Sequence, residues 1–233
     1  MISIVIPTYN EKDNIENLVN EIRKRAQAEI VIVDDNSPDG TGKIADRLSK
    51  KYKNLRVLHR TSKSGLGSAI IEGFKMARGD IIGVMDADFS HPPSLIKKIS
   101  KEFDKGADIV LGSRYAKGGR IVNWPLKRKL TSRFAVLLAR PLTGAKDPVT
   151  GFFFVRKGVF DDIRIESGET KSWKVSLEII ARGQYKKLVE VPYTFVNRKA
   201  GKSKISSREY KNYMSQIISL MAFKMKKKLK PNL

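Results

Sequence analysis

The chain has 233 residues, of which 41% are apolar and 30% charged, with a formal net charge of +22 and no cysteine. This composition predicts a globular domain and excludes disulfides, thiolate metal sites and cysteine nucleophiles. Its apolar runs are far shorter than the roughly 20 residues of a spanning helix, and its first residues form a strand-like run without a signal peptide, so we expect a cytoplasmic protein that does not cross a bilayer by itself.

The first half of the chain alternates short β-branched runs with helical patterns. The runs predicted to be buried strands are Ile2–Ile6, Glu29–Asp34, Leu55–His59, Asp80–Met85 and Asp108–Gly112. Apolar residues at three- and four-residue spacing predict helices near Lys12–Gln27, Thr41–Lys51, Ser68–Ala77 and Ser94–Phe103. The alternation is typical of a doubly wound α/β sheet, in which ligands bind at the carboxyl ends of the strands.

The second half is less regular. Its predicted elements are a basic amphipathic helix at Leu126–Leu142, a strand at Phe152–Val155, a helix at Val175–Ala181, a strand at Leu188–Val196, a loop at Lys199–Ser207 and a last helix from Ser207. Pro192 interrupts Leu188–Val196, which indicates an edge strand because proline cannot donate to a ladder. The residues predicted to share one apolar face of the last helix are Tyr210, Tyr213, Met214, Ile217, Ile218, Met221 and Met225.

The positive charge is concentrated in the second half. Residues 1–110 carry 18 basic and 16 acidic side chains, whereas residues 111–233 carry 28 and 8. This asymmetry predicts an anionic partner, which is nucleic acid, a membrane surface or a phosphorylated substrate. The helix Leu126–Leu142 and the last helix, which ends in Lys224–Lys230, both suit an anionic membrane surface, with packing on the domain core as the alternative for each.

Polar groups follow three of the predicted strands. Pro7–Glu11 ends the first strand, Asp34–Gly40 the second and Asp86–Asp88 the fourth. In an extended strand Asp86 and Asp88 point the same way, and two such charges are costly unless a cation lies between them. Oxygen ligands with open positions suit Mg²⁺ or Mn²⁺ bound together with substrate phosphates.

Segments along most of the chain resemble family 2 glycosyltransferases of GT-A fold. In the first half these segments are Pro7–Glu11, Val33–Thr41, Gly65–Gly67, Asp86–Pro92 and Gly112–Tyr115. Later segments narrow the resemblance to the members that make dolichyl-phosphate (polyprenyl-phosphate) mannose, and these are Trp124–Arg133, Asp147–Gly151, Arg198 and Gly201–Lys204. The resemblance implies a doubly wound mixed sheet, with residues 1–206 as the catalytic domain and residues 207–233 as a membrane-associated amphipathic basic helix.

The function that the resemblance implies is transfer of mannose from GDP-mannose to dolichyl or polyprenyl phosphate, with inversion. The residues it assigns to the donor are Pro7, Tyr9, Glu11, Val33, Asp35, Asp86, Ala87, Asp88, Arg114, Arg198 and Lys204. It assigns Mg²⁺ or Mn²⁺ to Asp86, Asp88 and Ser90, and the acceptor phosphate to Arg114, Arg128 and Ser132. Asp88 and the three acceptor residues form the expected catalytic group.

Three further residues have two interpretations each. His91 is either a metal ligand or, as we favour, a packing residue at a helix start. Asp147 and Glu178 contact the sugar or form structural pairs, and for Glu178 we favour a position on the helix surface.

The chemistry of the acceptor independently favours cations near it. A phosphate monoester has a second pKa of about 6, so it is mostly dianionic at neutral pH and needs no general base. It needs positioning against repulsion from the donor diphosphate, which cations provide. Arg128 and Ser132 are four residues apart, so one helical face presents both.

Two other classes of protein fit parts of the sequence. A nucleic-acid-binding module explains the net charge, but Asp35, Asp86 and Asp88 would repel phosphate without a metal, so we expect no nucleic-acid partner. A nicotinamide oxidoreductase needs G-x-G-x-x-G after the first strand, where Pro7–Tyr9 stands instead. Within the glycosyltransferases, UDP-glucose remains the competing donor. We expect a peripheral protein on the cytoplasmic face of a membrane, and the resemblance leaves a membrane-anchoring subunit open as a partner.

Overall fold

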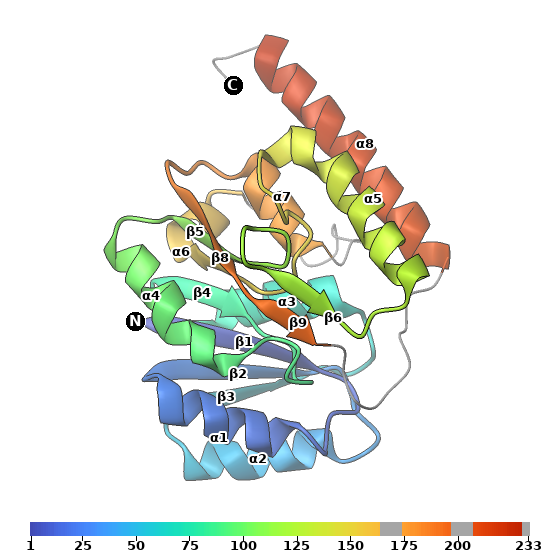
Figure 1. The fold of residues 1–233 in the computed structure, drawn as a ribbon. Coiled ribbons are helices and arrows are strands. Elements are labelled where there is room, and N and C mark those ends of the chain that lie inside the picture. Colours follow the sequence, from blue (N-terminus) through green and yellow to red (C-terminus); the bar gives the residue numbers. More distant parts are fainter. Residues whose placement is uncertain (164–173, 197–206, 230–233) are drawn as a thin grey trace.

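The protein is described by a computed structural model that covers residues 1–163, 174–196 and 207–229. Its centre is a seven-stranded sheet in the order β3-β2-β1-β4-β7-β5-β8 (Figure 1). The strands of this sheet are β1 (Ile2–Thr8), β2 (Ala28–Asp34), β3 (Leu55–His59), β4 (Ile81–Val84), β5 (Ile109–Ser113), β7 (Phe153–Arg156) and β8 (Leu188–Pro192). Only β7 runs against its neighbours in this sheet, β4 and β5, so the sheet is mixed, as expected.

Helices cover both faces of this sheet. One layer consists of α1 (Ile15–Arg25), α2 (Thr41–Lys51) and α4 (Ile96–Asp104), the last of which follows the short 3₁₀ helix η1 (Pro93–Leu95). The other layer consists of α3 (Leu66–Met76), α6 (Lys157–Asp161) and α7 (Val175–Arg182). In β1, Ile4 and Ile6 face the first layer and Val5 the second, because successive side chains of a strand point to opposite faces. Burial on both faces explains the uninterrupted apolar runs of the sequence.

The predicted strand Leu188–Val196 is divided into two elements. β8 is the edge strand that Pro192 indicated, and β9 (Thr194–Val196) pairs in parallel with β6 (Arg120–Val122) in a separate sheet. The predicted loop Lys199–Ser207 lies outside the described residues, except that Ser207 begins the last helix.

Two long helices, α5 (Leu126–Thr143) and α8 (Ser207–Leu229), lie side by side and pack against α7 (Figure 1). Besides the two hydrophobic cores on the faces of the sheet, the protein thus has a third core, whose buried residues are Val136, Ala139, Leu142, Val149, Leu177, Ala181, Tyr213, Ile217 and Leu220. The Tyr213 hydroxyl also donates to the carbonyl of Ala135 at 2.5 Å. Both helices therefore belong to the packed body of the protein.

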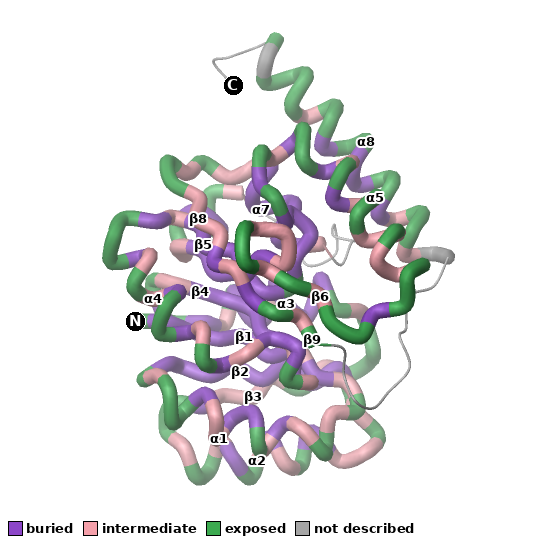
Figure 2. Tube along the Cα trace, in the orientation of Figure 1, coloured by how far each residue is buried: buried purple, intermediate pink, exposed green. Residues whose placement is uncertain are grey.

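The apolar face predicted for α8 is only partly buried. Tyr213 and Ile217 are buried against α5 and α7, whereas Met214 and Ile218 are 42% and 63% exposed. Figure 2 shows buried and exposed residues succeeding one another along α8. The helix therefore carries two apolar stripes, one packed and one exposed. Among the helices of the described residues, none combines the length and apolar character that crossing a bilayer requires.

Candidate functional site

The carboxyl ends of β1 and β2 bring the expected nucleotide-binding residues together. Pro7 of β1 is the register partner of Val33 of β2, and Tyr9 and Asp35 follow directly at the same edge. The backbone N–H of Glu11 donates to the Thr41 hydroxyl at 2.9 Å, which links the loop after β1 to the start of α2. Five predicted donor residues therefore lie at one edge of the sheet.

Arg60 belongs to this edge and was missed by sequence reasoning. Its guanidinium, 7% exposed, lies 2.7 Å from Asp35 Oδ1 and 3.2 Å from Glu72 Oε2. The backbone N–H groups of Ser64 and Gly65 donate to the same Asp35 carboxylate, each at 3.2 Å. A cation and two amides thus fix the orientation of Asp35. The available signal was a basic residue directly after a predicted strand, at the edge where the acidic residues gather.

The loop after β3 also reaches Tyr9. Lys63 Nζ lies 3.8 Å from the centroid of the Tyr9 ring, which is a cation–π distance. Segments after β1, β2 and β3 therefore meet around the ring that we expect to stack on a nucleobase.

The fourth strand end places Asp86 beside a buried histidine. The Asp86 backbone N–H donates to His91 Nδ1 at 2.9 Å, so the neutral ring carries its proton on Nε2, which lies 3.6 Å from Asp86 Oδ2. The ring stacks on Phe152 with centroids 4.9 Å apart. Burial lowers the pKa of His91, which keeps the ring neutral at pH 7. His91 is therefore a packing residue, as favoured from the sequence, and it orients Asp86.

Space for Phe152 is made by a glycine. A Cβ on Gly112 of β5 would lie 2.3 Å from Phe152 Cδ1, so a side chain there would displace the ring on which His91 stacks. The Gly112–Tyr115 motif therefore supports the Asp86 edge as well as supplying Arg114.

The residues after Asp86 suit a divalent cation. Ser90 donates its backbone N–H to Asp88 Oδ1 at 3.0 Å, and its buried hydroxyl has no hydrogen-bond partner among the described residues. Phe89 between them has φ +60°, which is uncommon for a bulky residue and indicates local strain of the kind found at binding sites. Within residues 1–163, 174–196 and 207–229, no three His, Asp or Glu side chains gather around a metal position.

That donor set fits the ion that the sequence predicts. Two carboxylates and an unsatisfied hydroxyl suit Mg²⁺ or Mn²⁺, which bind proteins through few carboxylates and take their remaining ligands from phosphate oxygens and water. Asp86, Asp88 and Ser90 would hold it.

Arg114 follows β5 and is paired with Asp147. Arg114 Nε donates to Asp147 Oδ2 at 2.8 Å and Arg114 Nη2 donates to Oδ1 at 2.7 Å, while the Arg114 backbone N–H donates to Oδ2 at 2.9 Å. Burial works against the guanidinium charge, but the Asp147 carboxylate raises the pKa of Arg114 above its ordinary value. Of its two interpretations, Asp147 is therefore shown in a structural pair. The Nη1 group of Arg114 is not used by this pair.

A cationic cavity lies next to α5, and of the three expected acceptor residues only Arg114 lines it. Ser132 Oγ accepts a hydrogen bond from the Tyr115 hydroxyl at 2.9 Å, which joins α5 to the segment after β5. The cavity has a volume of about 310 Å³ and is lined by Arg114, Tyr115, Gly119, Arg120, Ile121, Lys129 and Arg133. Sequence reasoning missed Arg120, Lys129 and Arg133, although the last two follow the same four-residue spacing as Arg128 and Ser132.

Lys174, which precedes α7, is a further residue that sequence reasoning missed. Its ammonium donates to the Val149 carbonyl at 3.0 Å. Burial, followed by the nearby Arg114 cation, lowers the pKa of Lys174 to about 7. Ser176 Oγ donates to the carbonyls of Pro148 and Thr150 at 3.1 and 2.8 Å. The start of α7 therefore holds the segment that carries Asp147.

The surface position favoured for Glu178 is wrong. Glu178 is 9% exposed, accepts from Arg182 Nε at 2.6 Å and accepts from Gln216 Nε2 at 2.9 Å. It is enclosed because α8 packs over α7, which the local pattern around Glu178 does not reveal. The two remaining donor residues of the prediction, Arg198 and Lys204, lie outside the described residues.

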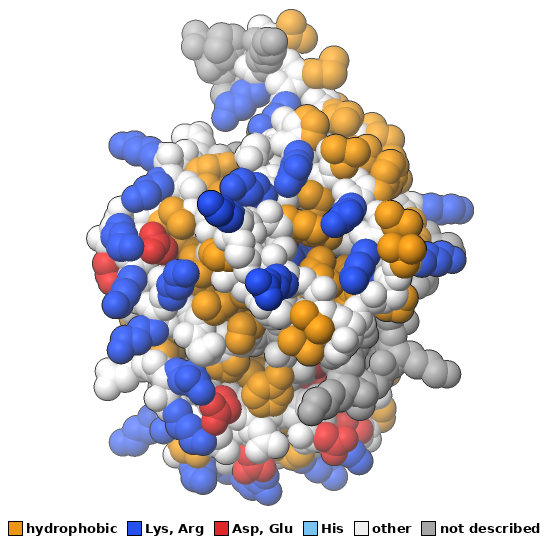
Figure 3. Space-filling view, viewed as in Figure 1, with side chains coloured by type: hydrophobic (Ala, Val, Ile, Leu, Met, Phe, Trp, Pro, Cys, Tyr) orange, Lys and Arg blue, Asp and Glu red, His pale blue; other side chains and the backbone are white. Residues whose placement is uncertain are grey.

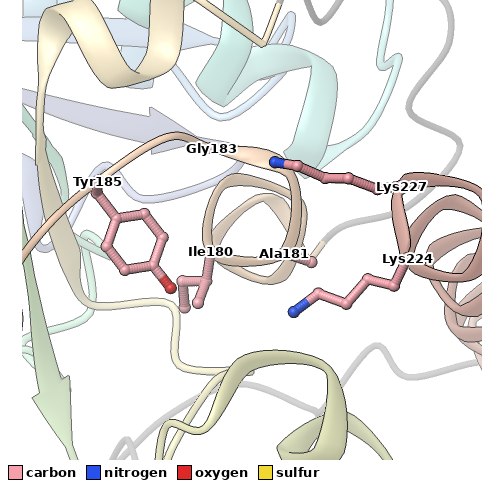
Figure 4. A pocket seen from close by; sticks show the side chains of 6 residues that line it. All are labelled: Ile180, Ala181, Gly183, Tyr185, Lys224 and Lys227. Carbon is pink, nitrogen blue, oxygen red and sulfur yellow. The ribbon is translucent and has the colours of Figure 1, made fainter. Parts of the chain in front are cut away.

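A second cavity lies apart from this site, between the end of α7 and the last turns of α8 (Figure 4). It has a volume of about 470 Å³ and is lined by Ile180, Ala181, Gly183, Tyr185, Lys224 and Lys227. None of the predicted site residues that the structure describes lines it. The lysine side chains extend into the opening, so this end of α8 is cationic on its inner side.

Comparison with known proteins agrees with the expected family. The sequence profile that defines glycosyl transferase family 2 matches residues 3–164. The chain is 44% identical to a dolichol-phosphate mannosyltransferase of Pyrococcus furiosus, over 94% of this chain and 63% of that protein. It is 36% identical to a dolichol-phosphate mannosyltransferase of Saccharomyces cerevisiae, over 95% of this chain and 87% of that protein. The chain thus spans less than two thirds of the Pyrococcus relative.

Solved structures agree on the fold. A mannosyltransferase from Pyrobaculum calidifontis, in complex with GDP-Man and Mn²⁺, matches with a TM-score of 0.59 at 17% identity, over 97% of this chain and 64% of that one. At this identity the match shows the glycosyltransferase fold alone.

Proposed function

Because the chain belongs to glycosyl transferase family 2, we propose that it transfers mannose from GDP-mannose to dolichyl or polyprenyl phosphate, with inversion at the anomeric carbon. The relatives are named for mannosyl transfer to dolichol phosphate, and the fold neighbour binds GDP-Man and Mn²⁺, which supports the proposal. The observation that carries it is the position of Arg114. This residue follows β5 and lines the cationic cavity, and only β7 separates β5 from β4, the strand that Asp86 and Asp88 follow. In this proposal Arg114 stands between the edge that binds the donor and the cavity that receives the acceptor phosphate.

At the donor edge, the side chains suit a nucleotide diphosphate. Tyr9 would stack on the base, and Asp35, held by Arg60, would accept hydrogen bonds from base N–H or ribose hydroxyl groups. Asp86, Asp88 and Ser90 would hold Mg²⁺ or Mn²⁺, which when bound neutralises the diphosphate and stabilises the charge of the leaving GDP. Asp86 keeps its orientation through His91.

At the acceptor side, the charge of Arg114 is largely balanced by Asp147, so Arg114 supplies directed N–H groups rather than net charge. The attraction for a phosphate dianion then comes from α5, through Lys129 and Arg133 in the cavity lining and through Arg128 on the same helix. A phosphate oxygen held by these groups attacks the anomeric carbon, the bond to GDP breaks, and a β-linked polyprenyl phosphate sugar forms. No group has to remove a proton, because the monoester is mostly ionised at pH 7.

The two exposed apolar stripes support an anionic membrane surface as a partner. On α5 the exposed residues are Leu126, Leu130, Phe134 and Leu137, and on α8 they are Met214, Ile218, Met221 and Met225. Figure 3 shows apolar side chains over these helices with Lys and Arg around them. Such surfaces bind at the boundary of headgroups and acyl chains.

We place the protein on the cytoplasmic face, because that leaflet carries the negative surface potential that attracts basic segments. In this proposal residues 1–206 are the catalytic domain and residues 207–233 the membrane-associated part. The side chain of Gln216 joins α8 to α7 by donating hydrogen bonds to the Lys174 carbonyl and to Glu178. A membrane-anchoring subunit would bind to the same exposed apolar stripes. Direct binding to lipid is therefore tested with vesicles that contain no other protein.

The decisive test is a donor panel. The purified chain is incubated with dolichyl phosphate in vesicles, Mg²⁺ or Mn²⁺, and GDP-mannose, UDP-glucose or UDP-GlcNAc, and lipid-linked sugar is measured. We expect product from GDP-mannose only, with β linkage by NMR. Product from UDP-glucose instead would establish the competing donor, and no lipid-linked product with any donor would overturn the proposal.

A further inference from the structure

We infer that Trp124 is a positioning residue of the acceptor site, where its indole ring orients Arg128 toward the acceptor phosphate. This inference rests on the proposed function and adds to it how the site recognises a phosphate monoester. Trp124 directly precedes the Pro125 cap of α5, and its side chain takes no part in the chemistry described above.

The geometry around Trp124 brings two arginines to one ring. The Arg128 guanidinium carbon lies 4.1 Å from the ring centroid, and that of Arg114 lies 5.7 Å from it. Both distances are within the range of cation–π attraction. The two arginines assigned to the acceptor phosphate, which come from α5 and from the end of β5, are therefore brought together by an indole that is only 8% exposed.

Stacking and ion pairing orient a guanidinium in different ways. Asp147 fixes Arg114 and balances its charge, whereas an aromatic face such as the one that contacts Arg128 restricts a guanidinium without neutralising it. Bidentate binding of phosphate needs the guanidinium plane in one orientation. A flexible arginine loses conformational entropy when it adopts that orientation, and stacking removes part of this cost before the acceptor binds.

Trp124 is itself held by a cluster of aromatic rings. Phe195 contacts its edge with centroids 5.1 Å apart and planes at 72°, and Phe195 in turn lies 6.4 Å from His91. The Trp124 ring is therefore packed, through Phe195, against His91, the residue that orients Asp86. The indole N–H is buried without a hydrogen-bond partner among the described residues, which costs stability. Phenylalanine would fill the site without this cost, but its ring attracts cations less strongly than indole.

The inference is tested with Trp124→Leu, Trp124→Phe, Arg128→Ala and the double variant Trp124→Leu/Arg128→Ala. Citronellyl phosphate, a soluble isoprenyl phosphate, serves as the probe for calorimetry, and KM for dolichyl phosphate and kcat are measured at saturating GDP-mannose. The affinity for GDP with Mn²⁺ is measured on every variant. Tyr52→Leu is the matched control, because Tyr52 stacks on Arg23 at 3.7 Å on the first helix layer.

We expect Trp124→Leu to weaken citronellyl phosphate binding and raise the KM for dolichyl phosphate about tenfold, the effect of a desolvated cation–π contact. Trp124→Phe should change both by less than about threefold, because a ring face remains, and GDP affinity and the Tyr52→Leu control should not change. In the Arg128→Ala background, Trp124→Leu should have a much smaller effect, since only the longer contact of the indole with Arg114 remains.

Additive effects of Trp124→Leu and Arg128→Ala would overturn the inference, as would equal losses of GDP and citronellyl phosphate binding. If Trp124→Leu does not fold, the cycle of Trp124→Met with Arg128→Ala decides the matter by the same criterion, because methionine removes the ring face but fills more of the site, and absence of coupling overturns the inference. A native protein that binds citronellyl phosphate but forms no lipid-linked mannose would overturn the proposed function alone. A native protein that does not bind the probe would overturn the inference.

Discussion

The Arg114 guanidinium and the Asp147 carboxylate form a two-point ion pair in which neither side chain is more than 9% exposed. Removing one partner leaves the other charge buried without compensation. We expect Asp147→Asn to lower the free energy of unfolding by about 3–5 kcal/mol, measured by urea denaturation. Asp161→Asn is the matched control, because Asp161 is 53% exposed in its pair with Lys157 and should change stability by less than about 1 kcal/mol. Equal losses in the two variants would contradict the assignment.

Asp88 should matter for turnover and little for folding. Asp88→Asn keeps an oxygen acceptor for the Ser90 N–H but loses a carboxylate charge at the proposed metal site. We expect transfer to fall at least 100-fold, about 2.7 kcal/mol in the barrier, with a higher Mn²⁺ requirement and a nearly unchanged urea midpoint. Asp104→Asn, at an exposed position of α4, is the control. Undiminished transfer by Asp88→Asn would remove Asp88 from the metal site.

Buried His91 makes stability depend on pH. Burial lowers its pKa below the ordinary 6.5, so between the folded and unfolded pKa values the unfolded chain binds more protons than the folded one. The free energy of unfolding should therefore fall as pH decreases through about 6.5 toward the folded pKa. Urea titrations at several pH values without metal should show a flatter dependence for His91→Gln. The control His59→Gln removes the other histidine, which is half exposed beside Asp46, and should keep the His91 slope. An unchanged slope in His91→Gln would contradict this cause.

Membrane binding should depend on the exposed stripes rather than on the presence of α8. Deleting α8 would uncover Ile217 and the rest of the third core, so single substitutions are the sharper test. We expect Ile218→Asp and Phe134→Asp each to reduce cosedimentation with phosphatidylglycerol vesicles about tenfold or more, since each removes the burial of one large apolar side chain. Gln27→Asp makes the same charge change at an exposed position before β2. If it weakens binding equally, net charge alone holds the protein on vesicles.

Much of the fold could be predicted from local pattern. The uninterrupted apolar runs identified the first five strands of the central sheet, and the helix predicted at Leu126–Leu142 is observed at Leu126–Thr143. Both predictions succeed because strand burial and helix periodicity depend on the types of residues that are close together in the sequence. The edge position of β8 followed from the single residue Pro192. The meeting of the acidic strand ends at one edge followed from the rule that parallel strands present their carboxyl ends together.

The tertiary structure decided which distant residues meet. Nothing near Asp35 in the sequence indicates Arg60, nothing near Arg114 indicates Asp147, and the insertion of β7 between β4 and β5 depends on pairing across the chain. The sequence showed that α8 carries many apolar residues, but which stripe is buried depends on where α5 and α7 stand, and Glu178 is enclosed for the same reason. Residue type and spacing thus determine the elements and the kind of chemistry. Long-range packing decides whether a charged side chain forms an ion pair within the protein or faces a ligand, because burial and pairing depend on groups far away along the chain.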